Sequence, residues 1–191
     1  MKKLVTRSLL ILLSGILLGV WAQAGTVFTA DPINGVITGA PGQIIGWGFT
    51  ITNDTNFVVP TSSEFDPGNP LVGTYMDFIP FQFFVIGPAP ESSTATAAFD
   101  ANTQSGLGSF AILPGAPLGL LSGTLTLTYD VFSVSPNDPN FDPDADLIAV
   151  NQILSVPAGV DVEVTPEPAS FFMLGAGGLI LLARKRLLGS R

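Results

Sequence analysis

The chain has 191 residues, no cysteine, no histidine and a formal net charge of −8, which excludes disulfides, thiolate and imidazole catalysis, and the usual ligands of zinc, copper and iron. All seven Lys and Arg residues lie near the two ends, whereas residues 25–168 contain all fifteen Asp and Glu residues and no basic one. The side-chain charge of this span, 0 − 15 = −15, argues strongly against binding to nucleic acid.

The first 24 residues have the composition of a secretory signal peptide. A basic start, an apolar run and a small-x-small cleavage site follow one another: Lys2, Lys3 and Arg7, then Leu9 to Val20, then Ala22-Gln23-Ala24. We expect the export machinery to carry the chain out and signal peptidase to cleave it after Ala24. An uncleaved anchor is the alternative, but the apolar run is short for a membrane-spanning helix.

Residues 25–165 have the pattern of short β-strands. Apolar and polar residues alternate with period two in residues 45–51, 124–131 and 160–164, which is typical of strands with one buried face. Further candidate strands are residues 26–30, 56–60, 71–79, 81–86, 92–99, 107–113 and 147–154. Eight to ten strands separated by turn sequences such as DPGNP favour one acidic domain, an antiparallel β-sandwich of immunoglobulin-like or jelly-roll-like type.

Two aromatic segments of this domain have predictable faces. Trp47 is in phase with Ile45 and Phe49, so we expect it to lie in the core. In FQFF, residues 81–84, a strand would place Phe81 and Phe83 on one face and Phe84 on the other. An exposed Phe84 is therefore a candidate contact residue.

The sharpest local pattern of the domain is NDPNFDPDAD, residues 137–146. Oxygen-bearing side chains occur there at every second position: Asp138, Asn140, Asp142, Asp144 and Asp146. Because Ca²⁺ binds six to eight oxygen ligands, these residues are a candidate Ca²⁺ site. The loop is not an EF-hand, since Pro143 and Ala149 occupy the positions that require Gly and Glu. The alternative, which we favour, is a solvated acidic loop without metal.

No sequence motif of catalysis is found in the domain. Because residues 25–168 contain no Lys, Arg or His, Ser–His nucleophilic catalysis is not available to them. A glycosidase requires two carboxylates across a cleft, which sequence spacing does not reveal. We therefore assign no catalytic residue and expect a non-enzymatic protein, with a carboxylate-dependent hydrolase as the enzymatic alternative.

The last 26 residues differ in character from the acidic domain. Pro166-Glu167-Pro168 precedes fifteen uncharged residues, 169–183, and the basic cluster Arg184-Lys185-Arg186 follows them. This run is marginal for a transmembrane helix, which usually needs about 20 apolar residues, although Leu187 and Leu188 can extend it. Positive charge after the run predicts that the tip stays in the cytoplasm and that the domain faces outward.

This tripartite segment, residues 166–191, resembles the PEP-CTERM sorting signal of bacteria that make extracellular polysaccharide. The resemblance implies a sorting motif at Pro166, Glu167 and Pro168 and a basic tail at Arg184, Lys185 and Arg186. It also implies a processing partner, an exosortase, which is a multi-spanning membrane enzyme with a cysteine nucleophile. The resemblance does not extend to residues 25–165.

From these observations we expect an exported, membrane-anchored or sorted protein of the cell surface or extracellular matrix. The expected role is structural or adhesive, within or on the exopolysaccharide layer, with extracellular polysaccharide as a partner. The alternative function is that of a carbohydrate-binding module, assisted by Ca²⁺ if the acidic loop binds it.

Overall fold

The computed structural model describes residues 25–68, 72–88 and 93–164. The predicted signal peptide and the PEP-CTERM-like segment lie outside these described residues. Nine strands and one short 3-10 helix (η1) occur in the described part, in the order β1 (Val27–Asp31), β2 (Val36–Gly39), β3 (Ile44–Thr52), β4 (Phe57–Asp66), β5 (Gly73–Asp77), η1 (Ile79–Phe81), β6 (Thr94–Ala97), β7 (Gly108–Ile112), β8 (Gly119–Phe132) and β9 (Leu147–Val162). No helix within these ranges is long and apolar enough to cross a membrane.

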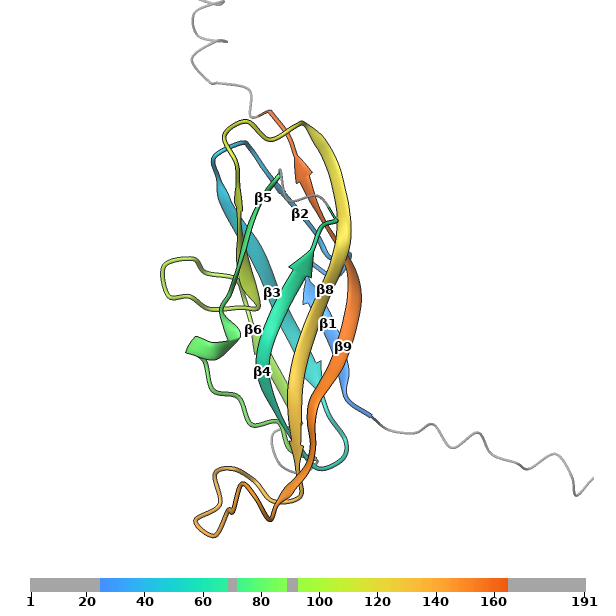
Figure 1. The fold of residues 1–191 in the computed structure, drawn as a ribbon, viewed down its shortest axis with the longest axis vertical. Coiled ribbons are helices and arrows are strands. Elements are labelled where there is room, and N and C mark those ends of the chain that lie inside the picture. Colours follow the sequence, from blue (N-terminus) through green and yellow to red (C-terminus); the bar gives the residue numbers. More distant parts are fainter. Residues whose placement is uncertain (1–24, 69–71, 89–92, 165–191) are drawn as a thin grey trace, which may run out of the picture.

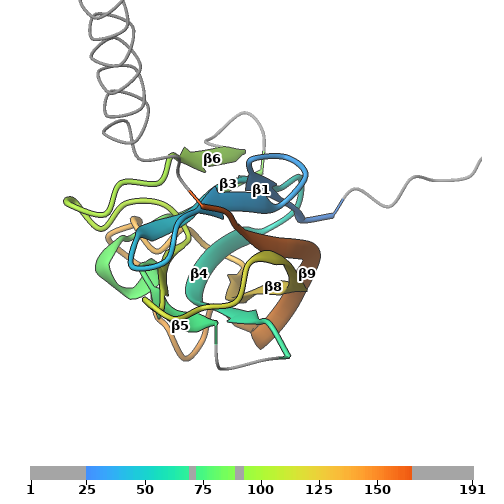
Figure 2. The same cartoon turned by 90° about the horizontal axis from the view of Figure 1, so that it is seen from above.

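The strands form two sheets (Figure 1). One has the order β1-β3-β7-β5, with β6 also pairing with β3, and the other has the order β2-β9-β8-β4. Seen from above, β1, β3 and β6 lie on one side of the body, and β4, β8 and β9 lie on the other (Figure 2). The predicted all-β class with antiparallel sheets is confirmed, and the arrangement is sandwich-like. One pair departs from the prediction, because β2 runs parallel to β9.

Apolar side chains from both sheets fill the space between them. Trp47, Phe49 and Ile51 of β3 are completely buried, as are Leu125 and Leu127 of β8. These are five of the eight apolar positions of the two clearest alternating segments, and the other three pack against the core partly buried, so the predicted inward faces, including Trp47 in the core, are confirmed. Among the described residues, every buried side-chain nitrogen or oxygen has a hydrogen-bond partner.

The prediction of a strand at residues 81–86 is wrong. Pro80 lies in the first turn of η1, and the chain returns to an extended conformation only at Gln82. The Gln82 amide then donates to the carbonyls of Phe78, at 3.1 Å, and Gly106, at 2.8 Å. A proline at the start of a helical turn has a suitable φ angle and needs no hydrogen-bond partner, which explains why the turn forms here.

The register of the strands defines two ends of the body. At the first, which we call the exit end, the described chain stops at residues 162–164, beside the β2–β3 turn (40–43) and the β7–β8 loop (113–118). At the opposite end, which we call the far end, lie the start of β1 and the β8–β9 loop (133–146). Figure 1 shows the two ends separated along the long axis of the body.

Candidate functional site

Two exposed phenylalanines form the most ligand-like surface feature of the described residues. Phe81 is 60% exposed and Phe83 is 68% exposed. The expectation for Phe84 is wrong: it is partly buried against the core, with its ring 5.3 Å from that of Phe49 in an edge-to-face contact. The three rings do alternate as predicted, with Phe81 and Phe83 on one side and Phe84 on the other, but the side that faces solvent is that of Phe81 and Phe83.

A tight polar loop, residues 100–105, is held next to this aromatic pair. Gln82, between the two phenylalanines, donates to the carbonyl of Gly106, which directly follows the loop. Asp100 and Ser105 close the loop with two backbone hydrogen bonds of 3.0 Å. The Asn102 backbone N–H donates to the Asp100 carboxylate at 2.8 Å and lowers the pKa of that carboxyl. Exposed aromatic rings beside anchored polar groups are a common composition of ligand-binding surfaces.

The acidic loop at the far end uses its carboxylates to stabilise its own backbone. Asp138 accepts the backbone N–H of Asn140 at 2.8 Å, and Asp142 accepts that of Asp144 at 3.0 Å. Asp146 accepts the backbone N–H of Asp142 at 2.9 Å. Within the described ranges, no three acidic side chains are placed to hold a metal ion together. The five predicted ligands thus lie in one loop, and the contacts of Asp138 and Asp142 are those of Asx-type turns.

We expect millimolar CaCl₂ to leave the melting temperature of the protein unchanged, because the loop carboxylates already accept hydrogen bonds and do not converge. The measurement is thermal unfolding with CaCl₂, with MgCl₂ as a control for ionic strength. A Ca²⁺-specific increase in melting temperature that is lost in Asp142→Asn would contradict this expectation and restore the loop as a Ca²⁺ site.

A second polar cluster connects the two sheets, but it is enclosed. Ser63 of β4 contacts Tyr75 and Asp77 of β5: its Oγ lies 2.7 Å from the Tyr75 hydroxyl and 2.5 Å from Asp77 Oδ1. Asp77 also accepts the backbone N–H groups of Ser63 and Ile79, both at 2.9 Å. Burial raises the pKa of the Tyr75 phenol well above its ordinary value.

The directions of these hydrogen bonds can be assigned. Ser63 has one hydroxyl proton to donate. It donates this proton to Asp77, which makes the shortest contact with Ser63 Oγ and is the only carboxylate there. Tyr75 then donates to Ser63, while the nearby carbonyl of Leu107 accepts the backbone N–H of Phe78 at 3.1 Å. The cluster therefore is a satisfied chain of donors that joins β4 to β5, and its geometry is that of a structural contact.

Comparisons with known proteins add little to this surface chemistry. No protein-family model matches the chain, and no curated protein matches it. Among solved structures, one similar chain is WR4, a C. elegans MSP family member, with 11% sequence identity and a TM-score of 0.31. The match covers 71% of this chain and 97% of that one.

Proposed function

We propose that the protein is exported and held at the cytoplasmic membrane by its C-terminal segment, with the acidic β-domain outside. There it serves as a non-enzymatic surface or matrix protein associated with the exopolysaccharide layer. An exosortase-type enzyme recognises Pro166-Glu167-Pro168 and sorts or releases the domain.

One observation carries this proposal: every basic residue of the chain flanks an apolar run at one of its ends. Lys2, Lys3 and Arg7 precede the first run, and the remaining four follow residues 169–183. Basic residues placed in this way direct export and set membrane orientation. The domain between the runs has no cation, so its self-repulsion favours solubility outside the cell.

Within the two-sheet class we infer the immunoglobulin-like variant rather than the jelly-roll. The support is the start of the chain, where β1 joins one sheet and β2 joins the other, parallel to the last strand. A jelly-roll is built from antiparallel strands only.

Truncation after Thr165 tests the anchoring directly. We expect the full chain to remain with the membrane fraction after alkaline washing, and the truncated chain, which lacks the apolar run and the basic tail, to appear in the soluble exported fraction. A control with Pro166 and Pro168 changed to alanine keeps the run and should stay in the membrane while sorting is lost. Release of the full chain by alkaline washing would contradict the anchor.

Carbohydrate binding is the second candidate function, and the exposed pair Phe81 and Phe83 favours it. Flat apolar rings offer contact area at small cost in conformational entropy. The ligand expected here is an uncharged sugar chain, because the domain has no cation to pair with an acidic polysaccharide.

The expected result for Phe81→Ala with Phe83→Ala is at least a tenfold loss of affinity for a neutral polysaccharide, about 1.4 kcal/mol or more. Affinity electrophoresis in gels that contain the polysaccharide measures it. Ile153→Ala is a matched control, since Ile153 is 64% exposed and lies on β9. Equal retardation of the unchanged protein, the double variant and Ile153→Ala would contradict the carbohydrate-binding function. Unchanged melting temperatures would show that the fold of the variants is intact.

A further inference from the structure

Charge is distributed unequally between the two ends of the body. The far-end turns contain five acidic residues: Asp54, Asp138, Asp142, Asp144 and Asp146. At the exit end, the β2–β3 turn (APGQ, 40–43) and the β7–β8 loop (LPGAPL, 113–118) contain none. Two acidic residues, Asp161 and Glu163, lie at the exit end itself, on and just after β9, against five at the far end. The exit end is therefore the part of this acidic body that tolerates an apolar environment best.

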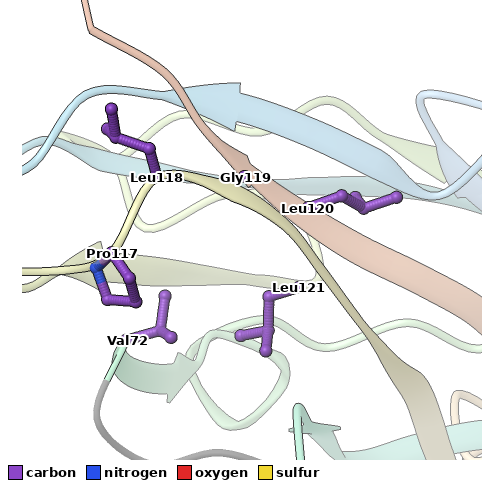
Figure 3. Close-up of a pocket in the computed structure, with 6 residues that line it drawn as sticks. All are labelled: Val72, Pro117, Leu118, Gly119, Leu120 and Leu121. Carbon is purple, nitrogen blue, oxygen red and sulfur yellow. The ribbon is translucent and has the colours of Figure 1, made fainter.

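Apolar side chains are exposed at the same end. Leu113, Leu118 and Leu120 are among them, together with Ile44 at the start of β3 and Val164 at the end of the described chain. An open hollow of about 210 Å³ lies beside them, lined by Val72 and residues 117–121. In Figure 3 the side chains of Val72, Pro117 and Leu121 turn toward one another, while Leu118 and Leu120 point away from them.

The length of chain between this end and the apolar run is short. Val164 is the last described residue, and the run begins at Ala169. Five Cα–Cα steps separate the two residues, and they span at most about 18 Å even when fully extended. The headgroup region on one side of a bilayer is several ångströms thick. If residues 169–183 enter the membrane, the exit end must lie at or very near the headgroups.

We infer that the exit end is a membrane-contact surface, on which Leu118 and its exposed apolar neighbours enter the interfacial layer of the outer leaflet. This inference rests on the proposed membrane anchor and adds an orientation to it. The body stands on the membrane by the end whose two turns carry no charge, and the acidic loop points away. Because the domain carries no cation, zwitterionic lipid is the surface it accepts, and anionic headgroups repel it.

The absence of cysteine from the chain allows a position-specific test. Leu118→Cys, Ile153→Cys and Asp144→Cys are made one at a time in the full chain, labelled with a polarity-sensitive dye and reconstituted into phosphatidylcholine vesicles. Ile153 is the matched control for Leu118, since both are exposed aliphatic side chains, 64% and 59% exposed. We expect a shift to shorter emission wavelength and quenching by a lipid-borne quencher at position 118 only.

The outcomes distinguish a failure of the membrane-contact surface from a failure of the anchor. If the chain floats with the vesicles but the dye at position 118 behaves like the dyes at 153 and 144, the anchor holds and the membrane-contact surface is wrong. If the chain does not float with the vesicles, the anchor itself is wrong and the contact surface is overturned with it. If the shift at position 118 occurs without vesicles, that surface is covered by a second copy of the chain, which also overturns the inference.

Discussion

Trp47→Ala is expected to lower the free energy of unfolding by about 3–5 kcal/mol, a large part of the stability of a domain of this size. The indole is completely buried and lies 4.8 Å, centroid to centroid, from the ring of Phe65 in the opposite sheet. Its Nε1–H donates to the carbonyl of Gly35 at 2.7 Å. The substitution removes packing between the sheets and leaves a cavity where β2, β3 and β4 meet. Denaturant unfolding followed by circular dichroism measures the change.

Trp47→Phe separates packing from the hydrogen bond. An aromatic ring remains, and the carbonyl of Gly35 still accepts the backbone N–H of Gly159 at 3.0 Å. We therefore expect this variant to lose only about 1–2 kcal/mol. A loss below about 1 kcal/mol for Trp47→Ala would contradict the central packing role of the indole.

The second large effect is expected for Asp77→Asn, at about 2–3 kcal/mol. The Asp77 carboxylate only accepts hydrogen bonds, and its two oxygens receive three: from the backbone N–H of Ser63, the hydroxyl of Ser63 and the backbone N–H of Ile79. An asparagine amide has one oxygen and one NH₂ group, so a donor must face a donor in either orientation. Urea unfolding at pH 7 is suitable, because a phenol is protonated there and burial raises the pKa of Tyr75 further.

Ser63→Ala provides the comparison for this network. Asp77 keeps its two backbone donors, and the Tyr75 hydroxyl can turn to the carbonyl of Leu107, which lies 3.3 Å away. The expected loss is about 1–2 kcal/mol, smaller than for Asp77→Asn. If Ser63→Ala proved the more destabilising of the two, Asp77 would not be the central acceptor of the cluster.

The strands that could be predicted from the sequence are those with two different faces. The apolar positions of residues 45–51 and 124–131 alternate because one face of β3 and of β8 packs on the core and the other does not. The short β2 was not predicted, since its partner is the distant end of β9, in parallel, and nothing local in Val36–Gly39 encodes that pairing. Non-local pairing is the information that a single sequence lacks.

β9 shows why strand boundaries are harder to predict than strand cores. The sequence indicated two pieces, 147–154 and 160–164, separated by Pro157, whereas the strand runs continuously from Leu147 to Val162. The N–H of Gly159 points away from β8 and donates to the carbonyl of Gly35. Because N–H groups two residues apart point to the same side of a strand, the nitrogen of Pro157 also points away from β8. A proline there removes no hydrogen bond to β8, so the strand continues through it.

The surface candidates were predicted less well than the core. The FQFF alternation separated Phe84 from Phe81 and Phe83 correctly, but it does not say which side faces the core, and Phe81 and Phe83 are the exposed rings. The strand itself is replaced by a turn, with Pro80 in η1 and the hydrogen bonds of Gln82 after it. Pro80 was the available signal for that turn. The five acidic-loop residues do lie together, but whether side chains converge on an ion depends on backbone geometry that spacing does not encode.

The most direct test of the proposed function is the intact mass of the protein from the membrane and medium fractions of its native host. We expect a membrane form that begins at Gly25 and ends at Arg191, and a sorted form that begins at Gly25 and ends near Pro166–Pro168, without the basic tail. A protein that begins at Met1 and is recovered from the cytoplasm would contradict both export and anchoring.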